Sequence, residues 1–436
     1  MENNNIYSKL TKDQLSSEQK NLSAQYESYK SKSLTLNMTR GIPCKDQLDL
    51  SNDMLKIDMG EIDYLAKNMG DFRNYCSPGG LMGTFEAREL FSDLMGADSV
   101  EEVMVGGNSS LAIMHDTMAR SFMHGTTEES VAWHKLSGED KAKFLCPVPG
   151  YDRHFSICEA LGVEMINIKM NPDGPDMDAV ERLANSDPSI KGIWCVPKYS
   201  NPEGITYSDE VVRRLANLSP AAKDFRIYWD NAYIVHDLSE EGDCLLNIFA
   251  ELKKNKKEDM IYMFASTSKI TFCGGGVAAI CASEKNIKYL SSKAFVQMIC
   301  PDKINQMRHV LFLKDTDGIK AQMARHRKII RPKFDAVLDG LKKGLGETGL
   351  ANWTSPNGGY FISLNVPCGC AKRTVELAAG LGLALTPAGA TYPYKKDPED
   401  KNIRLSPTFP TVGDLTLATE ALCICAKLAY IEKIGE

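Results

Sequence analysis

Short apolar runs alternate with helical patterns through the middle of the chain, and this alternation limits the possible folds more than any other feature. The apolar runs are residues 102–105, 143–147, 164–168, 192–197, 226–230, 261–265 and 277–282. Between them, apolar residues recur at helical spacing, for example at Met177, Val180 and Ala184. Nearly continuous apolar strands that alternate with helices are typical of a largely parallel sheet covered on both faces. The sequence therefore predicts an α/β fold with a mostly parallel seven-stranded sheet.

The length of the chain and its C-terminal pattern predict a second, smaller domain. A chain of 436 residues exceeds what one hydrophobic core usually serves. A long helical pattern follows Leu313, and beyond it strand-like and helical segments form a small α+β pattern at 358–365, 373–379, 402–405 and 412–434. The predicted division is an N-terminal segment at 1–60 that packs with the small domain, a large domain at 61–312, and a linking helix with the small domain at 313–436.

The composition argues against nucleic-acid, membrane and metal-binding functions. The net charge of -6 provides no overall basic field, and no long stripe of Lys and Arg follows the sequence. No run reaches the roughly 18 apolar residues of a membrane span, and residues 1–5 lack the basic and apolar parts of a secretion signal. The 13 cysteines show no disulfide framework, and the pairs Cys368/Cys370 and Cys423/Cys425 lack zinc-site spacing. We expect a cytoplasmic protein without nucleic acid, membrane or metal partners.

Three polar motifs stand at the ends of three predicted strands. Lys269 closes a Ser-Thr-Ser-Lys motif, Asp230 ends the preceding apolar run, and Asn201 opens an Asn-Pro-Glu-Gly motif after a third run. Open α/β sheets bind ligands at the carboxyl ends of their strands. A lysine there can be partly desolvated, which lowers its pKa and lets the neutral amine form a Schiff base. A carboxylate can pair with a protonated pyridine nitrogen, and an amide can donate to a ring oxygen. Seen alone, the motifs also fit a loop lysine, a helix N-cap and a turn.

The order of the three motifs resembles that of fold-type I aminotransferases, and the resemblance extends over most of the chain. Asn-Pro-x-Gly, Asp-x-Ala-Tyr and Ser-x-Ser-Lys follow one another at intervals of about 30 to 40 residues. Upstream, the segment Gly-Gly-Asn-Ser-Ser at 106–110 opens an amphipathic helix, and a helix N-terminus suits a phosphate group. The resemblance implies a fold-type I pyridoxal-phosphate-dependent aminotransferase, with pyridoxal 5'-phosphate as cofactor, amino-acid and 2-oxo-acid substrates, and a homodimer with shared active sites.

The resemblance also implies roles for individual residues. Lys269 is expected to hold the cofactor as a Schiff base and to move the substrate proton, Asp230 to pair with the pyridine nitrogen, and Arg404 to bind the substrate α-carboxylate. Tyr75 is expected to cross the dimer interface to the partner's phosphate. The other expected contacts are Tyr151 stacked on the ring as a third catalytic residue, Asn201 and Tyr233 at the ring oxygen with Asn201 also near the substrate, Gly107, Asn108, Ser109, Ser266 and Ser268 at the phosphate, and Arg40 and Gly41 closing over the substrate.

The sequence departs from the family pattern at one position, and three further segments indicate which amino acid is the substrate. The common pattern places an arginine about eight residues after the lysine to grip the phosphate, and Val277 stands there instead. Phosphate anchoring therefore needs another donor or more backbone contacts. The Thr-Arg-Gly-Ile-Pro segment, the Gly-Gly-x-Ser-Ser loop and Ser-Lys-Ile-Thr before three glycines resemble a bacterial aspartate aminotransferase subgroup. That resemblance implies aspartate and 2-oxoglutarate as substrates, with Arg40, Lys303 or Arg308 at the distal carboxylate.

Three other functions stay open at this point. Another pyridoxal-phosphate enzyme of the same fold is one, such as an aromatic or alanine transaminase, a carbon–sulfur lyase or a decarboxylase. A non-catalytic cofactor-binding module, as in certain transcriptional regulators, is the second. A nucleotide-binding α/β protein that uses Gly106 and Gly107 is the third, although neither G-x-G-x-x-G nor G-x-x-x-x-G-K-[ST] occurs there. The three ordered motifs favour the transaminase.

Overall fold

A mixed sheet with the strand order β4-β11-β10-β9-β8-β5-β6-β7 forms the centre of the larger part of the molecule. The computed structural model describes residues 5–435 except 61–62, 64, 68–69 and 76–79. The strands are β4 (Val103–Val105), β5 (Lys143–Val148), β6 (Glu164–Asn171), β7 (Gly174–Pro175), β8 (Ile190–Cys195), β9 (Arg226–Asp230), β10 (Ile261–Ser266) and β11 (Ala278–Cys281). Strands β6, β5, β8, β9 and β10 pair in parallel, and β11 is antiparallel to β10 and β4. The predicted seven strands and mostly parallel sheet are confirmed, and β7 adds a short antiparallel edge.

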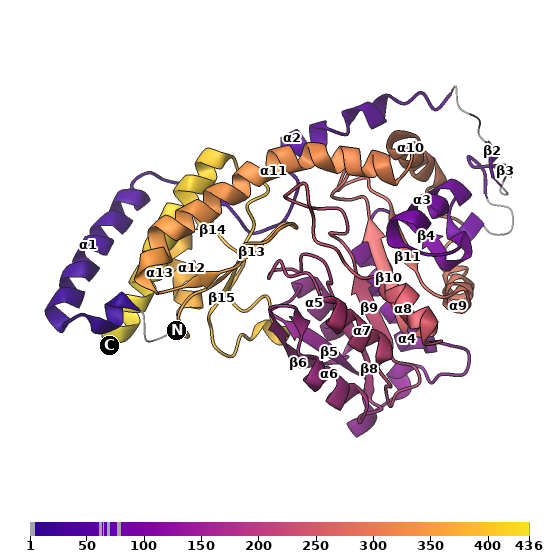
Figure 1. Cartoon of the computed structure of the whole chain (residues 1–436), viewed down its shortest axis with the longest axis horizontal. Helices are drawn as coiled ribbons and strands as arrows, with labels where there is room; N and C mark the ends of the chain where they lie inside the picture. The colour runs from indigo at the N-terminus through magenta and orange to yellow at the C-terminus, as the bar shows by residue number, and fades with distance from the viewer. Residues whose placement is uncertain (1–4, 61–62, 64, 68–69, 76–79, 436) are drawn as a thin grey trace.

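Helices cover both faces of this sheet, as the apolar runs predict (Figure 1). One face carries α3 (Phe85–Met95), α6 (Met177–Ala184), α7 (Asp209–Asn217) and α8 (Ile248–Lys254), and the other carries α4 (Ser110–His124), α5 (Asp152–Leu161) and α9 (Glu284–Ala294). Along β9, Ile227 and Trp229 belong to the hydrophobic cluster of the first face and Tyr228 to that of the second. Successive side chains of a strand point to opposite faces, so the central residues of β9, Ile227 to Trp229, are all apolar.

The smaller part of the molecule is built on a three-stranded antiparallel sheet. Its strands, in the order β12-β13-β15, are β12 (Asn352–Trp353), β13 (Ile362–Asn365) and β15 (Asn402–Leu405). The long helix α11 (Thr316–Leu345) leads to it from the larger part, preceded by α10 (Lys303–Leu313) (Figure 1). Helices α12 (Ala371–Gly380) and α13 (Val412–Gly435) pack on the sheet through one hydrophobic cluster. The predicted strand at 358–365 is correct in its second half only, since regular pairing begins at Ile362.

The N-terminal segment lies against this smaller part. Helix α1 (Lys12–Lys30) begins with a capping box between Thr11 and Gln14, and it packs against α13 with Leu22 buried. Strand β1 (Leu36–Asn37) pairs in parallel with β14 (Leu383–Ala384). The chain then continues through α2 (Lys45–Asp49) toward the larger part, where β2 (Leu65–Ala66) pairs with β3 (Gly70–Asp71). The exact domain limits at residues 60 and 312 stay a prediction.

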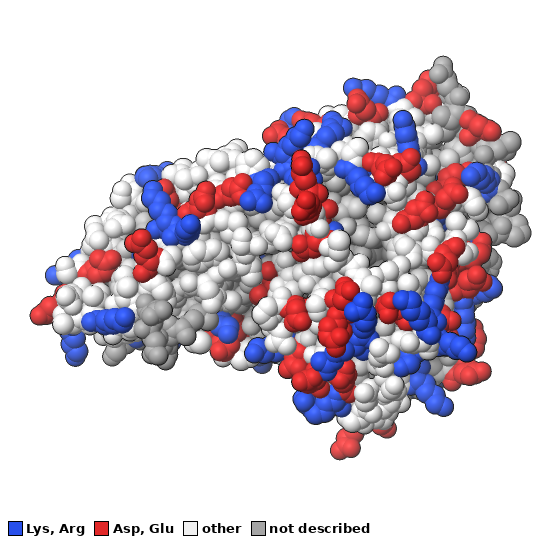
Figure 2. Space-filling view, in the orientation of Figure 1, with Lys and Arg blue, Asp and Glu red and all other residues white. Residues whose placement is uncertain are grey.

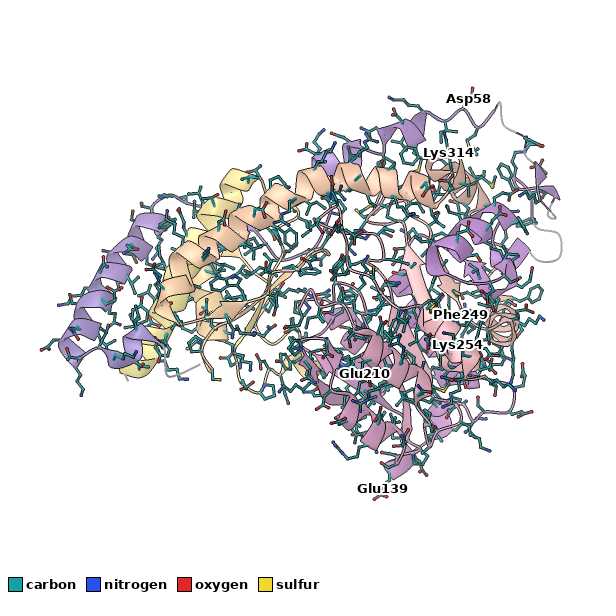
Figure 3. All side chains as sticks on the ribbon, in the orientation of Figure 1. Asp58, Glu139, Glu210, Phe249, Lys254 and Lys314 are labelled. Carbon is teal, nitrogen blue, oxygen red and sulfur yellow. The ribbon has the colours of Figure 1, made fainter. Side chains whose placement is uncertain are left out.

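The surface of the described chain is mixed in charge. Figure 2 shows basic and acidic side chains interspersed over the visible face. Helix α8 illustrates how the layers are made, because Phe249 is fully buried while Lys254 on the same helix is exposed (Figure 3). Within the described residues, no helix combines the length and apolar character needed to cross a membrane.

Candidate active site

A cavity of about 400 Å³ lies at the carboxyl ends of β8, β9 and β10. Segments from four regions meet around it, namely the N-terminal segment, the starts of α4 and α5, the central sheet and the smaller sheet. Eight of the residues singled out from the sequence line it: Arg40, Gly41, Tyr151, Asn201, Asp230, Tyr233, Lys269 and Arg404. Residues up to 364 positions apart in the chain are thus brought together, as the positions of Arg40 and Arg404 show.

Lys269 stands just beyond β10, on the inner side of the cavity. Its Nζ lies 5.2 Å from the ring centroid of Tyr233 and 5.7 Å from that of Tyr360. Burial lowers the pKa of the Lys269 amine, and the charge of Asp230 opposes this shift. A buried amine with a lowered pKa is neutral for a larger share of the time, and the neutral amine is the nucleophilic form.

Asp230 is the last residue of β9 and is almost completely buried. One carboxylate oxygen, Oδ2, lies 3.0 Å from Nε2 of His154. The other oxygen, Oδ1, is buried and has no hydrogen-bond partner among the described residues. Leaving a buried carboxylate oxygen without a partner is costly. The orphaned oxygen therefore fits a donor brought by a ligand, such as the protonated pyridine nitrogen of pyridoxal 5'-phosphate.

His154 is a residue that the sequence interpretation missed. It lies on the first turn of α5 and stacks on Trp194, with ring centroids 4.1 Å apart and an interplanar angle of 7°. Since the same ring also contacts Asp230, it fixes the orientation of that carboxylate. The available signal was its position three residues after Tyr151, on the helix whose start was already assigned to the cofactor ring.

Three more predicted ring contacts surround the same space. Asn201 is buried, and its Oδ1 accepts from Nη1 of Arg404 at 3.3 Å. Tyr233 is buried, and burial raises the pKa of its hydroxyl well above the ordinary value. Burial also raises the pKa of Tyr151, whose ring meets that of His154 edge-on at 4.9 Å. Both tyrosines therefore keep their protons at neutral pH and can donate hydrogen bonds.

Arg404 on β15 is buried and already has a counter-ion. Its Nη1 lies 2.7 Å from Oδ1 of Asp152, and its guanidinium lies over the ring of Phe361 at 5.0 Å. Nη2 reaches Oγ1 of Thr386 at only 3.5 Å, and the buried Nε has no partner among the described residues. The guanidinium thus keeps donors for a further acceptor. Asp152 was not predicted, because nothing in the sequence pattern linked α5 to β15.

The charged residues around the cavity differ from the set proposed for the distal carboxylate. Arg40 lines the cavity, as does Arg153, which the sequence interpretation missed. Both side chains are exposed. Lys303 does not line the cavity, and its Nζ donates to the carbonyl oxygen of Asn74. Arg308 lies on α10, also away from the lining residues.

The residues predicted at the phosphate lie beside the cavity, outside its lining set. Gly107, Asn108 and Ser109 connect β4 to α4, and Ser268 Oγ donates to the carbonyl oxygen of Asn108 at 2.8 Å. Ser266 ends β10 next to them. A Cβ atom added at Gly107 would meet nothing within 4 Å, so the space above the loop is open. The two predicted phosphate segments are therefore adjacent.

Tyr75 does not line this chain's own cavity. Its side chain is 72% exposed, and it is absent from the lining residues. The neighbouring residues 76–79 lie outside the described part of the chain. The expected role of Tyr75 at a partner's phosphate stays a prediction.

The sequence and the fold both match known aminotransferases. Residues 10–436 match the family described as aspartate amino-transferase. The aspartate aminotransferase of Corynebacterium glutamicum is 44% identical over 407 residues, which cover 93% of this chain and 92% of that protein. The crystal structure of an aspartate transaminase from Corynebacterium glutamicum superposes with a TM-score of 0.91 at 42% identity, covering 97% of both chains.

A more distant structure shares the fold. An α-aminoadipate aminotransferase from Thermus thermophilus, crystallised with N-(5'-phosphopyridoxyl)-L-leucine, has a TM-score of 0.71 at 20% identity, over 92% of this chain and 93% of that chain. The match over nearly the whole chain, together with the cavity at the strand ends, establishes the family. The protein belongs to the aspartate aminotransferase family and is a fold-type I aminotransferase that uses pyridoxal 5'-phosphate.

Proposed function

We propose that the protein moves the amino group of aspartate to 2-oxoglutarate, with Lys269, Asp230 and Tyr151 as its catalytic residues. The observation that carries this proposal is the buried oxygen of Asp230 without a partner, which shares the cavity with the lysine whose pKa is lowered by burial. Asp230 would pair with the ring nitrogen of the cofactor, and Lys269 would bond to its carbonyl carbon. When bound, the cofactor supplies a ring that withdraws electrons from the substrate Cα.

The inner residues of the cavity then perform the proton transfer. Asp230, held by His154, would face the ring nitrogen of the cofactor, and Lys269 Nζ would take the proton from the substrate Cα and hold it for return. Tyr233 and Asn201 would hydrogen-bond the ring oxygen, and Tyr151 would stack on the ring. The loop with Gly107, Asn108 and Ser109, together with Ser266 and Ser268, would hold the phosphate. These side chains and backbone groups would orient the cofactor ring and would leave the proton of the substrate Cα to Lys269.

The outer residues bind the amino acid. Arg404 has donors left after its contacts with Asp152 and Asn201, and a carboxylate suits a planar guanidinium in a two-bond arrangement. We assign the substrate α-carboxylate to it. Arg40 and Arg153 are the guanidinium groups of the cavity lining that form no ion pair with a carboxylate among the described residues, and we assign the distal carboxylate to this pair. Gly41 lets the N-terminal segment approach Phe361, because a Cβ atom there would lie 2.5 Å from that ring.

A panel of substrates tests the reaction. The holoenzyme is mixed with each of the twenty amino acids, its absorbance is followed, and the oxo acids formed are identified. Aspartate and glutamate should change the spectrum most rapidly and yield oxaloacetate and 2-oxoglutarate. Release of carbon dioxide, or of sulfide from cysteine, without a matching oxo acid would show a decarboxylase or lyase instead.

We further propose that the protein acts as a homodimer in the cytoplasm. Tyr75 is exposed, and so are Phe295, Val296 and Ile299 between α9 and α10. An apolar surface of this kind usually marks an interface. The described cysteines are all free thiols, which suits a reducing compartment. Sedimentation should give a dimer, and Tyr75→Phe should weaken cofactor binding more than it lowers kcat. A fully active monomer would refute the shared site.

A further inference from the structure

The first turns of α10 touch the glycine turn that follows Lys269. Asn305 Nδ2 donates to the carbonyl oxygens of Gly275 and Gly276, at 3.0 and 3.1 Å. One turn later, Nε2 of His309 lies 2.9 Å from Oγ1 of Thr271 in the same connection. The helix therefore holds the chain on the C-terminal side of the catalytic lysine through side-chain contacts from two successive turns.

The same turn of α10 also touches three other segments. Gln306, which is fully buried, donates from Nε2 to the carbonyl oxygens of Val105 and Gly106 at 3.3 and 3.4 Å, directly before the Gly107–Ser109 loop. The Oε1 of Gln306 accepts from the N–H of Thr84 at 2.8 Å. Lys303 Nζ donates to the carbonyl oxygen of Asn74, next to Tyr75. Three neighbouring side chains thus bind backbone carbonyls of the glycine turn after Ser268, of the residues just before the Gly107–Ser109 loop, and of the residue before Tyr75.

These contacts matter because the usual arginine is missing. Val277 is buried, and its N–H is used by Oγ1 of Thr267 at 2.9 Å. The hydroxyl of Ser268 is used by the carbonyl of Asn108. The N–H groups at 107–109 have no acceptor among the described residues, and they open the long helix α4. The affinity for a phosphate held by neutral backbone donors depends on how firmly those donors are fixed in place. A mobile loop must be ordered when the phosphate binds, and the entropy lost in that ordering lowers the affinity.

We propose that Asn305 and Gln306 are positioning residues that fix the phosphate cradle of the cofactor and compensate for the arginine replaced by Val277. Neither side chain needs to touch the phosphate. They bind the carbonyl sides of the two loops, which leaves the N–H sides of the β4–α4 loop free for the anion. Lys303 binds the segment that contains Tyr75 in the same way, through the carbonyl oxygen of Asn74. The inference rests on the assignment of the phosphate to these loops, and it is independent of which amino acid is transaminated.

The test compares the cofactor with its analogue that lacks the phosphate. The full-length protein is stripped of cofactor, and the dissociation constants of pyridoxal 5'-phosphate and of pyridoxal are measured by fluorescence or absorbance titration. Asn305→Ala removes two hydrogen bonds to the glycine turn, so the constant for pyridoxal 5'-phosphate should rise about tenfold while that for pyridoxal stays unchanged. Lys303→Met should give a smaller change of the same kind.

One control variant and one replacement variant make the result decisive. Asn255→Ala also removes an asparagine that donates to a backbone carbonyl, that of Ala216, but far from the cavity, and it should leave both constants unchanged. Asn305→Ser serves in place of Asn305→Ala if the latter does not fold. An equal change for both ligands, or none, would overturn the proposal. It would also be overturned if only Arg308→Gln lowered the preference for the phosphate, since Arg308, whose Nε is buried without a partner, would then be the direct anchor.

Discussion

The two walls of the cavity are built in different ways. The sheet wall consists of Asn201, Asp230, Tyr233 and Lys269, which follow or end neighbouring strands of one sheet. The outer wall consists of Arg40, Gly41, Phe361, Thr386 and Arg404, which come from the N-terminal segment and the smaller sheet. The sheet wall holds one carboxylate, that of Asp230, which is deeply buried, and one amine, that of Lys269, which is partly buried. The outer wall, together with nearby Arg153, holds three guanidinium groups, of which only Arg404 has a recorded carboxylate partner.

This difference separates chemistry from selection. Burial sets the protonation of the sheet wall, where it lowers the pKa of Lys269 and raises that of Tyr233. On the outer wall, the charged arginines instead match the carboxylates of the substrate, because a carboxylate in a partly dry site needs a cation. Changes in the sheet wall should therefore affect every substrate alike, while changes in the outer wall should depend on the substrate.

The largest effect is expected for Lys269→Ala in the sheet wall. Without the amine, no group at that position moves the proton at the substrate Cα, so kcat/KM should fall by about 10⁴-fold or more for every amino donor. Borohydride reduction of the wild-type holoenzyme, followed by peptide mapping, should find the cofactor on Lys269. A label on Lys198, or an active Lys269→Ala variant, would show that the sheet wall has been misassigned.

A smaller but general loss is expected for Arg404→Lys in the outer wall. The substitution keeps the charge but loses the two-bond fork, and charge-assisted pairs of this kind are worth on the order of 1.5–3 kcal/mol. Steady-state kinetics should show kcat/KM lowered roughly ten- to a hundredfold for aspartate and alanine alike, mainly through KM. If both values stay unchanged, Arg404 is only the structural partner of Asp152.

The sequence was sufficient to predict most of the sheet wall. Strand ends can be located from apolar runs, and parallel strands place their ends at one edge, so Asn201, Asp230 and Lys269 could be expected to meet. His154 was not predicted as a site residue, because the sequence around a helical histidine does not show which carboxylate it will contact. The order of the strands in the sheet, which decides that contact, is a property of the whole fold.

The outer wall could not be derived from spacing. Arg404 and Arg40 were proposed from the family resemblance, and both do line the cavity. Asp152 and Arg153 were missed because their relevance depends on how the smaller sheet approaches α5, which apolar periodicity does not determine. Lys303, one of the three cations that the sequence offered for the distal carboxylate, instead contacts the backbone of Asn74.

A selective effect is expected from the unpaired arginines of the outer wall. Arg153→Gln and Arg40→Gln each remove one cation near the expected distal carboxylate. The variant with the greater effect should lower kcat/KM for aspartate about tenfold. Alanine has no distal carboxylate, so its kcat/KM should stay within about twofold. Arg182→Gln, on α6 away from the cavity, is the matched control. Equal losses for aspartate and alanine would assign these arginines to structure or to the α-carboxylate.

The smallest effect on activity is expected for a substitution of His326 on α11. This residue contacts both the chain beside Lys269, in the sheet wall, and the N-terminal segment, in the outer wall. This buried ring lies 3.0 Å from the carbonyl oxygen of Ile270, next to Lys269, and 3.0 Å from Nε2 of Gln47 in the N-terminal segment. Gln47 Nε2 also donates to Oη of Tyr360 at 2.9 Å. In the neutral tautomer that fits, Nε2–H of His326 donates to the carbonyl and Nδ1 accepts from Gln47. A second ring proton would face the amide N–H groups of Gln47.

Acid should therefore weaken these contacts in a predictable way. Burial lowers the pKa of His326 to about 4, whereas its ordinary value is 6.5. Between these values the unfolded chain binds a proton that the folded protein does not, so the free energy of unfolding falls as the pH drops, by about 2 kcal/mol at pH 5. His326→Gln keeps one donor and one acceptor without a titrating proton. Chemical denaturation at pH 7 and pH 5 should show a loss for the wild type that exceeds that of the variant by about this amount, while kcat/KM at pH 7 stays within about threefold. Equal losses would mean that the ring titrates normally and that the walls are joined elsewhere.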